Sequence, residues 1–201
     1  MGKILIIDER AERKKTLMRE KDLSKLHEFE QEGVLFMLSS LPFSSSSSIE
    51  ELEKAFADYS VIAIHRSLMQ TENVINIIDE YFRISKKSFI IFSGGTSVND
   101  FSNNSLRLSI NAGDFYSSKL IDYIERQKNE IKSTSLLELL YGESWRLPLL
   151  LEYRNLFWCN RMTDEDEDRL RHAIDPTRQT PLDIDIVNKE IEKEKLKFLS
   201  I

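Results

Sequence analysis

Three groups of polar residues each follow an apolar run and could carry chemistry: the acids Asp8 and Glu9, the imidazole of His65, and the turn Ser93-Gly94-Gly95-Thr96. The two acids could hold a divalent cation, because hard cations prefer oxygen ligands. The alternative is that they cap the helix that follows and interact with the positive end of its dipole. A third carboxylate is missing nearby, so the first interpretation describes a weak metal site.

The serine–glycine turn could bind a phosphate, because adjacent glycines leave backbone N–H groups accessible. It lacks the Lys-Ser/Thr ending of a P-loop. The alternative is a tight turn that leaves a buried strand. A Ser-His-Asp hydrolase would need Ser93, His65 and Asp8 in hydrogen-bonded order, and the sequence has no nucleophile-elbow motif.

The elements that would position these residues are five apolar runs separated by helical periodicity. Residues 3–7, 34–38, 61–64 and 88–92 have the unbroken apolar character of strands buried on both faces of a parallel sheet. Residues 106–110 are weaker, and their partial alternation is typical of an edge strand. This order predicts a parallel sheet covered by helices on both faces. Open α/β sheets place their chemistry at the carboxyl ends of the strands, where the three polar groups would meet.

Two connections carry local signals of their own. Ser48, at the end of a serine-rich flexible loop, and Glu51 have the spacing of a capping box before a helix. The polar stretch 97–105 could hold a short helix.

This pattern resembles the receiver domain of two-component response regulators over about residues 3–131. The resemblance implies an α/β, flavodoxin-like fold with five parallel strands in the order 2-1-3-4-5. Receivers hold Mg²⁺ with two acids at the end of the first strand, and Asp8 and Glu9 stand there. A serine or threonine after the fourth strand contacts the phosphoryl group, and Ser93 matches it.

The chain departs from the receiver pattern at two positions that phosphoryl transfer requires. His65 stands in place of the phospho-accepting aspartate, and residues 110–113 lack the lysine that follows the fifth strand. Transfer needs a carboxylate nucleophile beside Mg²⁺ and a cation to neutralise the developing charge. An imidazole nitrogen would reach a different point and leave no oxygen to bridge the metal. The resemblance therefore implies a degenerate receiver, or pseudo-receiver, that keeps the fold, has lost the chemistry and needs no cofactor.

The composition excludes several classes of protein. A formal net charge of -6 argues against a dedicated nucleic-acid binder, which normally shows a basic patch. The single cysteine, Cys159, excludes an internal disulfide and predicts a buried structural thiol in a reducing compartment. No signal peptide opens the chain, and no apolar run approaches the roughly 18 residues of a membrane span. We therefore expect a cytoplasmic protein without membrane contact.

The alternation of strand-like and helical segments ends after the sheet. This change predicts two domains: a receiver-like domain at 1–132 and an all-helical module at 133–201. Residues 133–160 have the pattern of a helix, divided by Gly142 and Pro148, that is too apolar for a free surface helix. Its large aromatics and arginines are the residue types that dominate interfaces. The candidate partner-binding residues are Trp145, Arg146, Tyr153, Arg154, Phe157 and Trp158. The alternative is that they form a core within the chain.

Further start signals mark the later helices. Thr163 precedes an acidic run and predicts a helix cap, and Thr180 with Pro181 predicts the start of the last helix. That helix has a narrow apolar stripe among Glu and Lys, which suits a lid or a coiled-coil-like contact.

Three functions follow from these patterns. The leading prediction is a non-catalytic regulatory or scaffold subunit, which binds a protein partner or a second copy of itself through the helical module. The first alternative is a sensor of a small anionic or phosphorylated ligand at the sheet edge formed by Asp8, Glu9, His65 and the Ser93 to Thr96 turn. The second alternative is a metal-assisted hydrolase at that edge.

Overall fold

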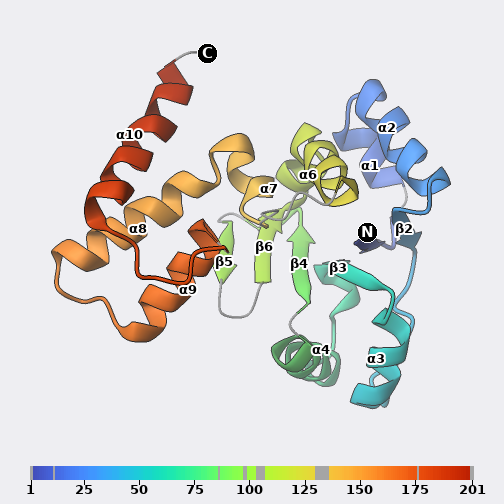
Figure 1. The fold of residues 1–201 in the computed structure, drawn as a ribbon. Coiled ribbons are helices and arrows are strands. Elements are labelled where there is room, and N and C mark those ends of the chain that lie inside the picture. The colour runs from blue at the N-terminus through green and yellow to red at the C-terminus, as the bar shows by residue number, and fades with distance from the viewer. Residues whose placement is uncertain are drawn as a thin grey trace. The chain divides into compact units, whose positions relative to one another are not determined.

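The computed structural model (Figure 1) describes residues 2–10, 12–85, 87–96, 99–102, 107–129, 136–175 and 177–199. The chain divides into two compact units, Met1–Ile131 and Lys132–Ile201, which we call the sheet unit and the helical unit. The predicted boundary between residues 132 and 133 lies outside the described residues. No helix in the described ranges has both the length and the apolar character that a membrane crossing requires.

The sheet unit has the predicted flavodoxin-like fold. Its strands are arranged in the order β2-β1-β3-β4-β6-β5. All neighbours are parallel except β5 and β6, so the five parallel strands stand in the predicted order 2-1-3-4-5, with β6 as the fifth. The strands are β1 Lys3–Ile7, β2 Leu35–Leu38, β3 Tyr59–His65, β4 Ser88–Ser93, β5 Asp100–Ser102 and β6 Arg107–Asn111.

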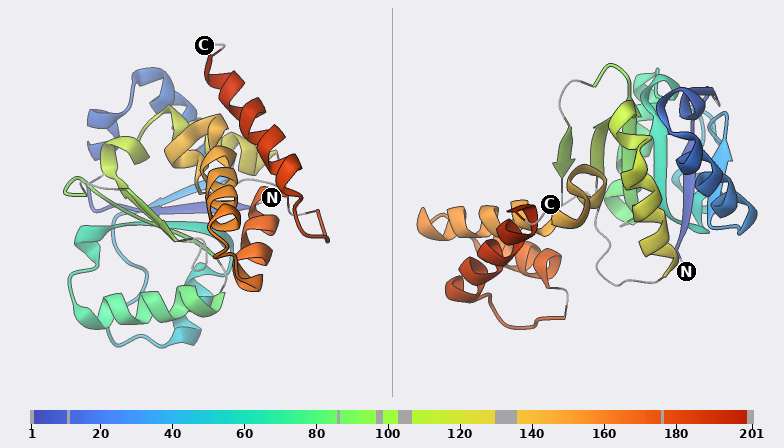
Figure 2. Two further views of the ribbon diagram at one scale, coloured as in Figure 1. Left: turned by 90° about the vertical axis from the view of Figure 1, so that its left-hand side faces the viewer. Right: turned by 90° about the horizontal axis from the view of Figure 1, so that it is seen from above.

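Helices cover both faces of this sheet, as Figure 2 shows on its left: α1, α2 and α6 lie on one side, and α3 and α4 lie on the other. The helices of the sheet unit are α1 Glu12–Leu17, α2 Glu20–Gln31, α3 Ile49–Phe56, α4 Glu72–Ser85, α5 Ala112–Phe115 and α6 Ser118–Lys128, with a 3₁₀ turn, η1, at Arg66–Leu68. The predicted capping box begins α3, because Ser48 and Glu51 exchange side-chain-to-backbone hydrogen bonds.

The unbroken apolar run of β1 is explained by its position. β2 and β3 pair with its two edges, and helices cover its two faces, so its residues from Ile4 to Ile7 are almost completely buried. A strand covered on both faces has no solvent side on which polar residues would be favoured. Asp8 is the first residue after this strand, which places its carboxylate at the carboxyl edge of the sheet.

The outer part of the sheet corrects two predictions. The polar stretch 97–105 could have held a short helix, but of its described residues, 99–102, three form the strand β5, which pairs antiparallel to β6. Residues 97, 98 and 103–105 lie outside the described residues. Because β5 pairs with it, β6 is not the outermost strand. Its alternation has another cause: Leu108 and Ile110 are buried, whereas Arg107 and Ser109 on the opposite face are only half-buried. The pattern indicates one well-covered face rather than an edge position.

The helical unit contains α7 Glu138–Tyr141, a 3₁₀ turn η2 Gly142–Ser144, α8 Arg146–Trp158, α9 Asp164–Ile174 and α10 Ile184–Leu199. Gly142 divides the predicted first helix, with a positive φ of 58° that favours glycine. Pro148 does not divide it, because it lies in the first turn of α8, where a missing N–H is tolerated. Thr163 caps α9 as predicted, accepting a hydrogen bond from the Asp166 backbone.

Two smaller predictions for this unit are wrong. The last helix begins at Ile184 rather than at Pro181, because Leu182 is buried with its N–H donated to Glu167, and Asp183 accepts a hydrogen bond from the Asp185 backbone. Cys159 is exposed rather than buried, since it follows the end of α8.

Candidate functional site

Asp8 is the buried centre of the carboxyl edge, with only 3% of its surface exposed. Its Oδ1 accepts hydrogen bonds from the Arg10 backbone at 3.0 Å and from the Arg13 guanidinium at 2.5 Å. Its Oδ2 accepts a hydrogen bond at 2.9 Å from the hydroxyl of Tyr116, the residue that follows α5. A buried carboxylate is stable only when it is paired and hydrogen-bonded, and these three donors meet that need.

Arg13, on the first turn of α1, bridges both predicted acids. One of its guanidinium nitrogens contacts Asp8, and the other donates to Glu9 Oε1 at 3.1 Å. Glu9 precedes α1, and Arg13 reaches back from the first turn of that helix to its carboxylate. The planar fork of an arginine suits two carboxylates better than a lysine would. Arg13 therefore lies where a cation shared by the two acids would be expected, and neutralises them from within the chain.

His65 ends β3 and is buried beside Glu9. Its Nδ1 accepts a hydrogen bond from the Ser67 backbone, lies 2.6 Å from the Ser67 hydroxyl and lies 3.2 Å from Glu9 Oε2. Burial and the charge of Arg13 lower the pKa of His65, against the opposing effect of Glu9 and Asp8. The imidazole is therefore neutral at neutral pH, and it caps the η1 turn.

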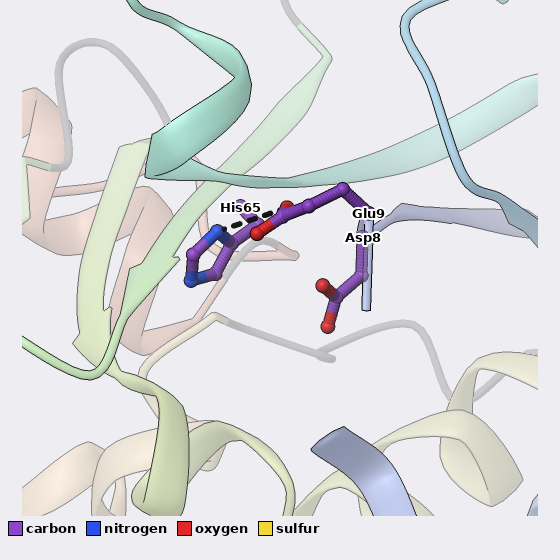
Figure 3. A group of neighbouring side chains, drawn as sticks. All are labelled: Asp8, Glu9 and His65. Atoms are coloured by element: carbon purple, nitrogen blue, oxygen red, sulfur yellow. Dashed lines mark ion pairs between the residues drawn. The ribbon is translucent and has the colours of Figure 1, made fainter. Parts of the chain in front are cut away.

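The three predicted residues do converge (Figure 3): one ligand atom from each of Asp8, Glu9 and His65 lies within 4.8 Å of the others. Oxygen and imidazole donors at that spacing could hold a divalent metal ion. However, both oxygens of Asp8 and one oxygen of Glu9 already accept hydrogen bonds from Arg13 or Tyr116. A metal ion would have to displace these donors.

The cluster should make the free energy of unfolding depend on pH in the acid range. Burial alone would raise the pKa of Glu9, but the Ser67 hydroxyl, the Arg13 guanidinium and the nearby His65 lower it to about 2. Because the folded chain binds fewer protons than the unfolded chain at Glu9 and His65, stability is lost as the pH falls. The His65 contribution is lost below about 6.5 and the Glu9 contribution between about 4.5 and about 2.

In Glu9→Gln we therefore expect the loss of stability between about pH 5 and about pH 3 to shrink by roughly 1 kcal/mol, after allowing for solvent screening. Urea unfolding at the two pH values measures this difference. Glu12→Gln is the matched control, because Glu12 pairs with Lys15 in an exposed ion pair on the next helix. If the natural protein, Glu9→Gln and Glu12→Gln all lost the same stability between these two pH values, the assigned role of Glu9 would be contradicted.

The Ser93 to Thr96 turn is held by its own hydrogen bonds. Ser93 Oγ accepts from the Gly95 N–H at 3.2 Å, the Ser93 carbonyl accepts from the Thr96 N–H, and the Thr96 carbonyl accepts from the Asn111 side chain. Two of the N–H groups that could have bound a phosphate are thus already used.

This turn lies between two hollows in the sheet unit. Gly94 lines a cavity of about 520 Å³ together with Arg10 and Arg13. Gly95 and Thr96 line another cavity of about 400 Å³, which contains Arg66 and Arg107. The turn therefore borders the Asp8 cluster on one side and a separate group of arginines on the other.

Sequence reasoning missed the residues that complete the cluster: Arg13, Tyr116 and Ser67. The spacing between Glu9 and Arg13 could have revealed the first, and the spacing between His65 and Ser67 the last. Tyr116 lies 108 residues from Asp8, and no local signal connects them.

The structure separates the six candidate partner-binding residues into two sets. Trp145 and Tyr153 are buried, and Arg146 donates to the Ile174 carbonyl within the unit, while Arg154 is half-buried. Phe157 and Trp158, at the end of α8, are exposed. Of the six candidates, these two aromatics are the exposed ones.

Comparisons of the chain with protein-family models, with curated proteins and with solved structures gave no match. The class of protein is therefore defined by the fold and the site: a flavodoxin-like α/β unit, whose acidic edge is neutralised by an internal arginine, followed by a helical unit.

Proposed function

We propose that this protein is a non-catalytic regulatory or scaffold subunit of the pseudo-receiver type, which binds a partner protein through its helical unit. The observation that carries the proposal is the exposed aromatic pair at the end of α8. Phe157 is 45% exposed and Trp158 is 68% exposed, with their rings edge to face and 6.1 Å between centroids. Aromatic side chains of this size contribute most when a partner removes them from water.

The surroundings of the pair indicate the chemistry of the partner. Beside Phe157 lies a groove of about 520 Å³, whose lining includes the acids Asp164 and Glu167 as well as Met162 and Pro181. The first turn of α9 adds further acids to this region. Charge complementarity therefore favours a partner segment with an apolar anchor flanked by Lys or Arg.

The sheet edge supports the non-catalytic half of the proposal. The receiver-like reaction needs a free pair of acids, a metal ion and a carboxylate nucleophile. Here Arg13 holds both acids, and the nucleophile position is a neutral imidazole that caps η1. We expect neither Mg²⁺ nor a small phosphodonor to change the protein.

A metal-assisted hydrolase is the second candidate, favoured by the convergence of Asp8, Glu9 and His65. It would require the displacement of Arg13 and Tyr116 before any metal could bind. A hydrolase must lose its rate in Asp8→Asn or His65→Ala with the fold intact. The pseudo-receiver proposal predicts no metal-dependent activity for those variants to lose.

Replacing Trp158 with alanine should reduce partner binding at least roughly tenfold, as expected for a central aromatic of an interface, with little change in stability because the side chain is exposed. The tagged full chain and this variant would be expressed side by side, and co-purifying proteins quantified by mass spectrometry. Tyr141→Ala is the matched control, since Tyr141 is an exposed aromatic of the same unit.

A stoichiometric partner that is lost with Trp158→Ala and kept with Tyr141→Ala supports the proposal. Light scattering at several concentrations identifies the case in which the partner is a second copy of the chain. The same partner on all three proteins, or a monomer with no partner at all, would overturn it.

A further inference from the structure

A second candidate site lies away from the Asp8 cluster, on the α3–α4 face of the sheet. It is a hollow of about 400 Å³, which we call the arginine hollow. It is lined by Arg66, Met69, Ile75, Ile91, Gly95, Thr96, Arg107 and Ser109. Its size lies within the range of small-molecule pockets.

The hollow exists because of the way β4 is connected to β6. Within the described residues, this connection carries β5 rather than a helix, so α4 is the last helix of the sheet unit on this face (Figure 2). The register pairs Phe89 with Arg107 and Ile91 with Ser109, which places the two polar residues of β6 on the face that α4 covers over β4. The covered half of the face is apolar, and the half over β6 is polar.

The charges around the hollow favour an anion. Among its described lining residues are two arginines and no carboxylate. Arg107 pairs with Asp79 at 2.9 Å, but the Arg66 guanidinium has no ion pair or hydrogen bond within the part of the chain that the structure describes. Asp100 lies opposite Ser109 in the β5–β6 ladder without lining the hollow. Arg66 is exposed, so its guanidinium can reach an anion from solvent at the mouth of the hollow.

The remaining lining residues divide into two chemical groups. Met69 and Ile91 are buried and form an apolar floor, with Ile75 beside them. Thr96 and Ser109 offer hydroxyls that have no hydrogen-bond partner among the described residues. A few polar groups next to an apolar floor are the usual composition of a small-molecule site.

We propose that the arginine hollow binds a small organic anion, with its phosphate or carboxylate between Arg66 and Arg107 and a compact apolar group on Met69, Ile75 and Ile91. The Thr96 and Ser109 hydroxyls supply further donors to the anion. Arginine suits this role because its planar fork matches the oxygens of a phosphate or a carboxylate. Binding of a small anion in the sheet unit is thus a function separate from partner binding by the helical unit.

The probes are phenyl phosphate and benzoate, compared with inorganic phosphate and with phenol, titrated into the full-length protein and followed by amide NMR. We expect at least one of the two aromatic anions to bind saturably in the millimolar range or tighter, with shifts at Gly95, Thr96 and Ser109. Inorganic phosphate offers only the anionic group, and phenol offers only the aromatic ring. Each should therefore bind at least roughly tenfold more weakly than the aromatic anion.

Arg66→Ala should weaken binding roughly tenfold or more, because a charged hydrogen-bond partner is lost. Arg83→Ala is the matched control, since it removes the same charge from an exposed position in the last turn of α4. Ser109→Phe should fill the hollow and block binding, with thermal unfolding as the check that the variant folds. Equal weakening by Arg66→Ala and Arg83→Ala, shifts confined to Arg10 and Arg13, or no saturable binding would each overturn the proposal.

Discussion

Replacing Arg13 with alanine is expected to destabilise the sheet unit by about 3 kcal/mol, because it leaves the buried carboxylate of Asp8 without its counter-ion. The Asp8 side chain is almost completely buried, and that of Arg13 is mostly buried, so water can replace the guanidinium only in part. Urea unfolding at neutral pH measures the loss. Arg10→Ala is the control, and its exposed side chain should cost no more than about 0.5 kcal/mol.

The same variant should gain an affinity for divalent cations that we do not expect in the natural chain. Without the guanidinium, Asp8 and Glu9 face one another with no positive charge between them, and millimolar Mg²⁺ should restore part of the lost stability. Adding Asp8→Asn should also recover stability, because it removes the unpaired charge. Arg13→Ala that is as stable as the natural protein, or insensitive to Mg²⁺, would show that Arg13 is not the counter-ion of this edge.

The second large effect is expected at Tyr153 in the helical unit. This side chain is 2% exposed, and its hydroxyl donates at 2.8 Å to the Leu182 carbonyl, so it connects α8 to the segment before α10. Tyr153→Ala should cost about 3 to 5 kcal/mol, as other deletions of buried aromatics do. Hydrogen exchange should show loss of protection in α8 and α10, while β1 and β3 keep theirs.

Tyr153→Phe separates packing from hydrogen bonding. It keeps the ring and removes only the hydroxyl, so the expected loss is about 1 kcal/mol, with a further cost from the carbonyl left without its donor. If β1 and β3 lost protection together with α8 in Tyr153→Ala, the two units would unfold as one, contrary to this prediction.

The parallel sheet was predictable from sequence because each of its central strands is buried on both faces. Residues 4–7, 61–64 and 89–92 have no polar position, which is the pattern of strands buried on both faces. β5 was not predictable, because its three residues lie in a polar stretch whose pairing depends on β6 rather than on local preference.

The site was predictable only in its outline. Asp8, Glu9 and His65 converge because parallel strands end at one edge, which follows from the order of the elements alone. The effect of Arg13 on them depends on the orientation of α1, and the contact with Tyr116 depends on the whole fold. For the helical unit, residue type could not distinguish Trp145 from Trp158, because buried cores and interfaces favour the same aromatics.

The short outer strand β5 has a consequence for how this protein avoids aggregation. Strand edges attract other chains because they present a row of unpaired N–H and C=O groups. With three residues, β5 presents very few of them, and it begins at the exposed acid Asp100. We therefore expect intermolecular strand addition along the described residues of β5 to gain little.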